Sequence, residues 1–251
     1  MNADPAAQRR LLDLAEVDAE LARVAHRRRS LPELAEAEQI QQELRTARDA
    51  LVGTETVASD LDREIRKLEA EVDQVRARED RDRRLLDSGS ISSAKHLEDL
   101  QHELATLQRR QTILEDDLLD VMERREATGA DIDRSRGVLT EIEQRLADAT
   151  TRRDDALGDL ASIEARRLGE RSALLADLPE DLVALYERIR AQKGTGAALL
   201  RQRRCGACRL ELDRIAIRAL LDAAPQEVLR CEECGVLLVR TAESGLAGSA
   251  K

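Results

Sequence analysis

Aromatic side chains are almost absent from this chain of 251 residues. It contains no Phe and no Trp, and Tyr186 is its one tyrosine. A broad globular core built on large aromatic side chains is therefore excluded. Charged residues make up 37% of the chain. A composition dominated by Ala, Leu, Glu, Asp and Arg with helical spacing predicts long helices that bury a narrow apolar seam.

Long apolar runs are lacking as well. No stretch approaches the roughly 18 apolar residues that a membrane-spanning helix needs, and no basic segment followed by an apolar one opens the chain. We therefore expect a cytoplasmic protein that neither spans a membrane nor is secreted. Lysine is scarce beside arginine, a bias usual in proteins from GC-rich genomes, so the many arginines are not in themselves a sign of nucleic-acid binding.

Cysteine is equally rare, but its arrangement is informative. All four cysteines fall in two Cys-x-x-Cys pairs, Cys205/Cys208 and Cys231/Cys234, with 22 residues between the pairs. Two residues between cysteines let one tight turn aim both sulfurs at a common point, and two such turns supply the tetrahedral thiolate set that zinc favours. Gly235 follows the second pair, where such a turn often needs positive φ. The sequence predicts one Zn²⁺ per chain on these four cysteines.

Three other interpretations of the cysteines stay open. Disulfides are disfavoured because there is no secretion signal and the rest of the chain lacks cysteine. A redox motif would need one pair only, in a βαβ context. Iron in a rubredoxin-like site uses the same four ligands. Since four thiolates close the coordination sphere, whereas a catalytic zinc keeps one position for water, we expect a structural metal.

Two long stretches repeat apolar residues in alternating steps of three and four, which is the pattern of a coiled-coil seam. The first runs from Ile40 to Val75 and the second from Leu97 to Leu174. Helix-start patterns occur twice around a proline: Ser30 with Glu33, and Asp177 with Glu180. The first of them, where the seam loses phase, predicts a break between a short opening helix and the first long arm.

The two arms match in length. Pro5–Asp87 and Ser92–Leu174 each contain 83 residues, and the turn signal between them is too short for anything but an antiparallel reversal. We predict a mainly α fold in which residues 1–176 form a long antiparallel coiled-coil hairpin, with its tip near 88–92 and a break near 30–32. The alternative is separate helices that assemble between chains.

The chain changes character after the hairpin. We expect residues 177–196 to form a connecting helix and linker, residues 197–241 a small β-rich zinc ribbon, and residues 242–251 a flexible tail. A ribbon of this size rarely stabilises itself, so the metal should supply much of its folding free energy, and little core should be shared with the hairpin. The expected elements of the ribbon are strands at Ala197–Arg203, Arg209–Leu212 and Val236–Arg240 and a helical turn at Ile215–Asp222.

Several of these features together resemble the bacterial four-cysteine zinc-ribbon proteins with an N-terminal helical hairpin, over nearly the whole chain. They are the hairpin, Leu185–Arg188, the strand into the first cysteine pair, the insert 212–221, and the second pair with Gly235 and Leu238. The resemblance implies zinc on the ribbon cysteines, and some members are reported to bind the enhancer-dependent RNA polymerase sigma factor and to influence flagellar or secretion genes. Here Val236 and Val239 stand where the family often has an arginine and an aromatic residue. The Arg and Ala bias indicates an actinobacterial member.

No catalytic constellation is present in the sequence. The three histidines, His26, His96 and His102, do not share a helix face. We therefore expect no enzyme activity and no small-molecule substrate.

Arg201, Arg203 and Arg204 crowd the first cysteine pair and are the candidate residues for contact with a protein partner or with nucleic acid. Alternatively, they balance the negative charge of the thiolates. Residues 177–251 carry 12 Lys/Arg against 11 Asp/Glu, and residues 1–176 carry 29 against 40, which argues against a large phosphate footprint. The sequence favours a non-catalytic adaptor or regulatory scaffold for a protein partner, in regulation related to transcription; RNA or DNA binding by the ribbon is the alternative.

Overall fold

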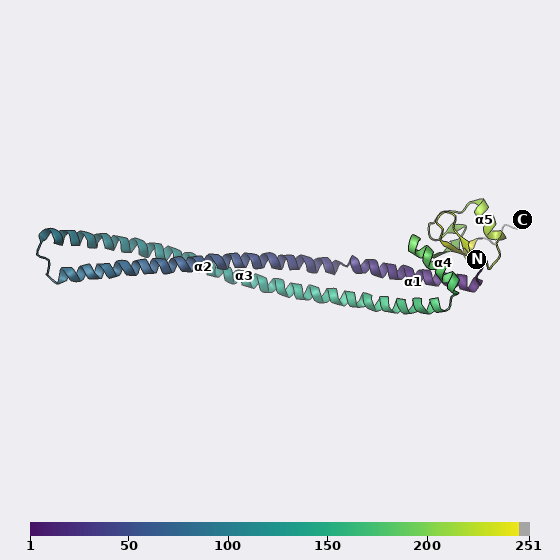
Figure 1. The fold of residues 1–251 in the computed structure, drawn as a ribbon, viewed down its shortest axis with the longest axis horizontal. Helices are drawn as coiled ribbons and strands as arrows, with labels where there is room; N and C mark the ends of the chain where they lie inside the picture. The colour runs from purple at the N-terminus through teal and green to yellow at the C-terminus, as the bar shows by residue number, and fades with distance from the viewer. Residues whose placement is uncertain (246–251) are drawn as a thin grey trace. The chain divides into compact units, whose positions relative to one another are not determined.

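The computed structural model describes residues 1–245, and it is mainly α-helical (Figure 1). Its internal contacts divide the chain into two compact units: Ala35–Thr151, here called the hairpin unit, and Met1–Leu34 with Arg152–Lys251, here called the terminal unit. The elements in chain order are α1 (Pro5–Arg29), α2 (Pro32–Asp87), α3 (Ala94–Ala176), α4 (Glu180–Lys193), β1 (Ala197–Arg201), β2 (Arg204–Cys205), α5 (Arg214–Asp222), β3 (Leu229–Arg230), β4 (Leu237–Val239) and the 3₁₀ turn η1 (Ala242–Ser244).

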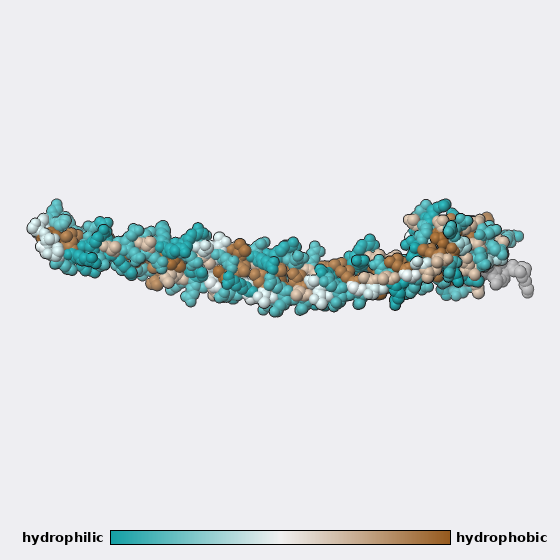
Figure 2. Space-filling view, turned by 60° about the horizontal axis from the view of Figure 1, so that its bottom comes forward, coloured by the Kyte–Doolittle hydropathy of each residue, from teal (hydrophilic) through white to brown (hydrophobic). Residues whose placement is uncertain are grey.

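Within the hairpin unit, α2 and α3 lie side by side and antiparallel (Figure 1). Their apolar residues meet in a narrow seam, and hydrophilic side chains border the apolar patches on the face shown in Figure 2. These helices confirm the predicted mainly α fold with a long antiparallel coiled-coil hairpin. The best-defined cluster of the seam contains Ala37, Ile40, Leu44, Ile142 and Ala149.

Ion pairs connect the two arms along the edges of the seam. Arg48 contacts Glu143 at 2.6 Å, and Arg136 contacts Glu55 at 2.8 Å. Both pairs are largely exposed to solvent, where such contacts contribute about 0–1 kcal/mol each. Burial of the seam therefore supplies most of the stability, and the charges help to fix the register of the arms.

The arms reverse direction between the end of α2 at Asp87 and the start of α3 at Ala94. Gly89 has φ +63°, a left-handed conformation that favours glycine. The amide of Ser88 still donates to the carbonyl of Arg84 at 3.0 Å, so the last turn of α2 is closed before the chain turns.

Helices begin where the two helix-start patterns predict them, α2 at Pro32 and α4 at Glu180, but neither pattern forms its capping hydrogen bonds. The Ser30 hydroxyl and amide both donate to the carbonyl of His26 at 3.1 Å, so Ser30 closes α1 and does not cap α2 with Glu33. Asp177 forms an ion pair with Arg10 at 2.9 Å and makes no cap for α4. In both places the polar side chain contacts a group outside the motif: the carbonyl of His26 for Ser30 and the guanidinium of Arg10 for Asp177. By contrast, the Asp4 carboxylate caps α1 through the amide of Ala6 at 2.7 Å.

The terminal unit has one main apolar core. It combines Leu11 and Leu14 of α1 with Leu182 and Tyr186 of α4, and it continues into β1 and β4. The expectation that hairpin and ribbon share little core is therefore wrong. Residues at the start of the first helix pack directly on β1 (Ala197–Arg201) and β4 (Leu237–Val239), the two central strands of the sheet.

The strands form one sheet in the order β2-β1-β4-β3. β1 pairs parallel with β4, from Ala197 opposite Leu237 onward, while β2 and β3 pair antiparallel with their neighbours. The expected strand Arg209–Leu212 does not form, because Arg209 has φ +64° and the segment contributes a single bridge between Glu211 and Arg204. The strand expected at Ala197–Arg203 ends at Arg201, where a tight turn begins.

The N-terminal residues are tied to the loop before the second cysteine pair (Figure 1). The amide of Ala3 donates to the carbonyl of Gln226 at 2.7 Å, and the amide of Val228 donates to the carbonyl of Met1 at 3.1 Å. The side-chain amide of Gln8, which is buried, donates to the carbonyls of Ala3, Pro225 and Gln226.

Part of the expected flexible tail 242–251 is ordered. The carbonyls of Glu243 and Ser244 in η1 accept from the amides of Gln202 and Arg203 at 3.0 and 3.2 Å, and Ser244 is buried. The tail prediction is thus wrong for residues 242–245, because these backbone groups satisfy the turn between β1 and β2. Residues 246–251 lie outside the described part of the chain.

Gly196, between α4 and β1, is expected to be intolerant of a side chain. A Cβ there would lie 2.5 Å from ring atoms of Tyr186, whose hydroxyl is held by a buried hydrogen bond. Gly196→Ala is therefore expected to destabilise the terminal unit by about 1–3 kcal/mol, measured by chemical denaturation. Gly158→Ala, in an open position of α3, is the control and should be neutral or stabilising. Equal stabilities of the two variants would contradict the close contact.

Candidate metal centre

The two cysteine pairs converge on one point in the terminal unit. The four Sγ atoms all lie within 4.8 Å of one another. Cys205 and Cys234 are 3.8 Å apart, and Cys208 and Cys231 are 3.9 Å apart. A disulfide requires about 2.05 Å, whereas a tetrahedral ion with bonds of about 2.3 Å separates its sulfurs by about 3.8 Å. All four cysteines are free, and their spacing fits a tetrahedral metal site.

Each pair sits in a turn with the same hydrogen bonds. The amides of Cys205 and Cys231 donate to the carbonyls of Leu210 and Val236 at 3.0 and 2.9 Å. The amide of the residue after each pair, Arg209 or Gly235, donates at 2.8 Å to the carbonyl of the first cysteine of that pair. Both residues have positive φ, +64° at Arg209 and +77° at Gly235. The backbone thus forms two equivalent turns, although only the second has the glycine that sequence inspection would select.

The thiols differ in their electrostatic surroundings. Burial raises the pKa of Cys205 to about 12, against the opposing effect of the amides of Cys208 and Ala207. Burial likewise raises the pKa of Cys231, while the amide of Leu210 lowers that of Cys208. Because a metal ligand is a thiolate, amides aimed at the sulfurs favour the metal-binding form.

Both turns rest on a second apolar cluster of the terminal unit. Cys205 and Cys231 are buried in it, so a metal there would hold the strands and α5 together from inside. The other buried members of the cluster are Leu200, Leu212, Ala216, Ile217, Leu220 and Leu238.

The three candidate arginines lie beside this cluster on the surface. Arg201 contacts Glu243 at 3.4 Å and Arg204 contacts Glu211 at 3.5 Å. Arg203 is exposed and sits in the tight turn with φ +66°. Arg201 and Arg204 are thus each paired with one carboxylate, and all three arginine side chains are exposed to solvent.

A buried charge network in the terminal unit was not anticipated from the sequence. Asp18 of α1 is 5% exposed. Its carboxylate accepts from the Tyr186 hydroxyl at 2.7 Å, from Arg171 Nε at 2.7 Å and from Arg190 Nε at 3.1 Å. Glu187 contacts both arginines, so α1, α3 and α4 are joined through one cluster. The sequence carries no local signal for this network, because Asp18 becomes buried only where Arg171 of α3 and Arg190 of α4 reach it.

Burial of the Tyr186 ring and its hydrogen bond to Asp18 raise the pKa of the phenol well above its usual value. The neutral hydroxyl is therefore the donor to Asp18. The Asp18 carboxylate also contacts the guanidinium groups of Arg171 and Arg190, so the charged side chains in this part of the core are paired with one another.

Arg240 fixes α5 to the sheet. Its guanidinium donates to the carbonyls of Leu220, Ala223 and Ala224 at 3.1, 2.8 and 2.5 Å. These carbonyls end α5, where the helix dipole favours a positive charge. The helix between the two cysteine pairs is thus anchored at its C-terminal end by the residue after β4.

Between residues 14 and 194 the chain matches the family model of the CT398-like coiled coil hairpin domain. The chain therefore belongs to this family of coiled-coil hairpin proteins. It is similar to Rv2229c of Mycobacterium tuberculosis, at 45% identity over 240 residues, 96% of this chain and 98% of that protein. ML1638 of Mycobacterium leprae is 36% identical over 224 residues, 89% of this chain and 96% of that protein.

Solved structures agree with the fold. A Mycobacterium smegmatis protein superposes with a TM-score of 0.87 at 43% identity, covering 96% of this chain and 100% of that one. CT398 from Chlamydia trachomatis superposes with a TM-score of 0.71 over 92% of this chain and 96% of its own; at 16% identity the likeness concerns the fold alone. The predicted family and its actinobacterial relatives are confirmed. Among residues 1–245, no helix has both the length and the apolar content to cross a bilayer.

Proposed function

We propose that this chain is a non-catalytic cytoplasmic adaptor in regulation related to transcription. Its metal-bearing end, the part of the terminal unit that carries the four cysteines, is stabilised by one structural Zn²⁺ and contacts a protein partner. The observation that carries the proposal is the closed set of four sulfur atoms within 4.8 Å. With four protein ligands no coordination position is left for water or substrate, so the ion stabilises the fold and performs no reaction. The residues that would hold it are Cys205, Cys208, Cys231 and Cys234.

Zinc is proposed over iron on chemical grounds. Both ions accept four thiolates, but zinc undergoes no redox change and takes tetrahedral geometry in structural sites. Two thiols with raised pKa would lose their protons on binding, which makes metal uptake dependent on pH.

A protein partner is favoured over nucleic acid by the side chains at the metal-bearing end. Recognition of single-stranded RNA usually stacks bases on aromatic side chains, and the one aromatic residue, Tyr186, is 0% exposed. Three large apolar side chains of the segment between the cysteine pairs are open to solvent: Leu210 at 51%, Ile215 at 79% and Leu221 at 40%. An exposed isoleucine beside arginines suits a protein surface that offers apolar and acidic groups.

The nucleic-acid alternative rests on the exposed Arg201, Arg203 and Arg204. These side chains would contact phosphates, and binding would weaken steeply with salt as counterions are released. Both functions use the same end of the chain, so variants there discriminate between them.

The test compares full-length wild type with Arg201→Gln/Arg203→Gln/Arg204→Gln and with Ile215→Asp, after zinc content has been checked. Leu119→Asp, at an apolar position of α3 that is 58% exposed, is the matched control. We expect Ile215→Asp to lose a co-purifying protein that Leu119→Asp retains, and we expect weak, non-specific binding of single-stranded RNA and duplex DNA. Salt-dependent RNA binding that the triple variant loses while keeping zinc would instead establish the nucleic-acid alternative.

A further inference from the structure

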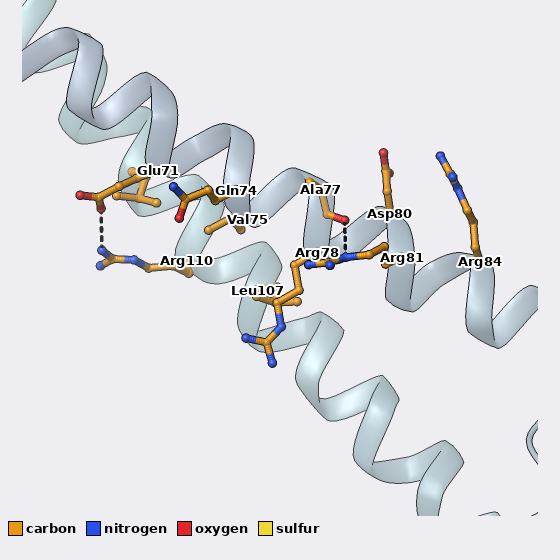
Figure 3. A pocket seen from close by; sticks show the side chains of 11 residues that line it. Glu71, Gln74, Val75, Ala77, Arg78, Asp80, Arg81, Arg84, Leu107 and Arg110 are labelled. Atoms are coloured by element: carbon orange, nitrogen blue, oxygen red, sulfur yellow. Dashed lines mark hydrogen bonds and ion pairs between the residues drawn. The ribbon is translucent and has the colours of Figure 1, made fainter.

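A groove beside the seam of the hairpin unit is unlike the rest of this acidic chain. It has a volume of about 1080 Å³ and lies between α2 and α3. Its apolar floor includes Val75 and Leu107, which are labelled in Figure 3, and the almost fully buried Leu114. Arg78, Arg81 and Arg84 line it from α2 and Arg110 from α3; two lining carboxylates, Glu71 and Asp80, oppose them. We call it the arginine groove. Its excess of positive charge contrasts with a chain of net charge −10.

The arginines of the groove are unequally engaged. Arg78 forms an ion pair with Glu103, and Arg110 contacts Glu71 at 3.4 Å, so these two connect the arms. Arg81 donates through Nε to the carbonyl of Ala77 at 3.2 Å, which leaves most of its guanidinium donors available. Arg84 projects from α2 in Figure 3, and no ion pair is recorded for it among residues 1–245.

The seam itself is interrupted beside the groove. The apolar repeat of α2 continues through Val72 and Val75, and the next two seam positions are Glu79 and Asp82. Glu79 is 6% exposed, and it and Asp82 each have one buried carboxylate oxygen without a hydrogen-bond partner. Carboxylates do not fill a seam as leucines do, and the two helices diverge past Val75 and Leu107 (Figure 3).

We propose that the arginine groove is a docking surface for an acidic amphipathic α-helix of a partner protein. The groove residues on α2 extend from Glu71 to Arg84, about 20 Å at 1.5 Å per residue, which matches a helix of about 13 residues. Apolar side chains at every third or fourth position of that helix would cover the half-buried Val75 and Leu107. Its carboxylates would pair with Arg81 and Arg84. All of these residues lie in the hairpin unit, so the proposal is independent of the one for the metal-bearing end.

Charge selects this partner over a basic one. An acidic helix is repelled by the acidic faces of the hairpin unit and attracted at the groove. A basic helix would be attracted to many acidic faces without preference. At the groove, a nucleic acid could pair its phosphates with only two arginines that form no ion pair among the described residues, Arg81 and Arg84, which are too few for binding along a phosphate backbone.

The probe is a synthetic helix of about 18 residues, with Leu at every third or fourth position and Glu at most of the others, labelled with fluorescein; the control peptide has Lys in place of Glu. Anisotropy titrations use full-length wild type, Arg81→Glu/Arg84→Glu and the control Arg66→Glu/Arg124→Glu, which changes net charge equally at exposed positions outside the groove. We expect the acidic peptide to bind wild type and the control alike, and the groove variant at least about tenfold more weakly.

A second variant tests the role of the seam. Glu79→Leu/Asp82→Leu is expected to raise the melting temperature, because leucines at these two positions continue the apolar seam and remove two buried carboxylate oxygens that have no hydrogen-bond partner among the described residues. Three results would overturn the proposal: equal affinity for wild type and Arg81→Glu/Arg84→Glu, tighter binding of the lysine peptide, or displacement of the acidic peptide by single-stranded RNA at equal concentration. Helix content of each variant is checked by circular dichroism, and Arg81→Gln/Arg84→Gln replaces a charge reversal that fails to fold.

Discussion

Cys231→Ser is expected to abolish metal binding and to unfold the metal-bearing end of the chain. Wild-type protein should contain one zinc ion per chain by elemental analysis, and the variant none. Structural zinc contributes about 10 kcal/mol or more to small sites of this kind, and Cys231 is 2% exposed within the cluster that also holds α5. Three remaining thiols would leave a buried, incomplete site.

The unfolding should not stop at the ribbon, because Leu11 and Leu14 of α1 share a core with β1 and β4. Hydrogen exchange is therefore expected to increase in β1, β4, α5 and the first half of α1. The seam around Ile40 and Ile142 in the hairpin unit is the internal control and should keep its protection. Iron in the wild type, two metals per chain, or unchanged exchange in α1 would each contradict this prediction.

Asp18→Ala should be the most damaging single substitution outside the cysteines. It removes the shared acceptor of Tyr186, Arg171 and Arg190 and leaves two guanidinium groups without their buried partner. Breaking a buried ion pair on one side costs about 3–5 kcal/mol. Tyr186→Phe, which loses one hydrogen bond to a charged group, should cost about 1.5–3 kcal/mol.

Chemical denaturation followed by circular dichroism measures both variants. In Asp18→Ala the single tyrosine adds a local signal, since its ring is fully buried in the terminal unit. Asp13→Ala, at an exposed position on the same helix, is the control and should change stability by less than about 0.5 kcal/mol. A cost for Asp18→Ala no larger than that of the control would show that the network is not stabilising.

Local patterns carried most of what the sequence could predict. Seam periodicity gave the long helices because a repeat of three and four survives over many turns, and the cysteine spacing gave the metal site because each turn needs only its own residues. Gly235 indicated the positive φ that closes the second turn, whereas the equivalent positive φ of Arg209 in the first turn was missed, since an arginine in the left-handed region carries no signal in the sequence.

Long-range pairing was beyond reach for physical reasons. β4 is three residues long, and nothing in its side chains specifies that it should pair parallel with β1. Ser30 has the spacing of a helix cap in the sequence, but its hydroxyl donates to the carbonyl of His26 at the end of α1. Whether Ser30 caps α2 or closes α1 depends on the path that the chain takes after α1. Asp18 similarly looks like a surface residue until α3 and α4 bring Arg171 and Arg190 to it.

The terminal unit is built from the first 34 residues and from the residues that start at Arg152. During synthesis, the apolar stripe of α1 with Leu11 and Leu14 therefore emerges long before β4 exists to cover it. The intervening hairpin unit can pair its arms in the meantime, because its contacts close around one turn. The ends of the chain would then join late, through contacts of high sequence separation, which makes this step slow and leaves α1 open to association with other chains until the last strand has been made.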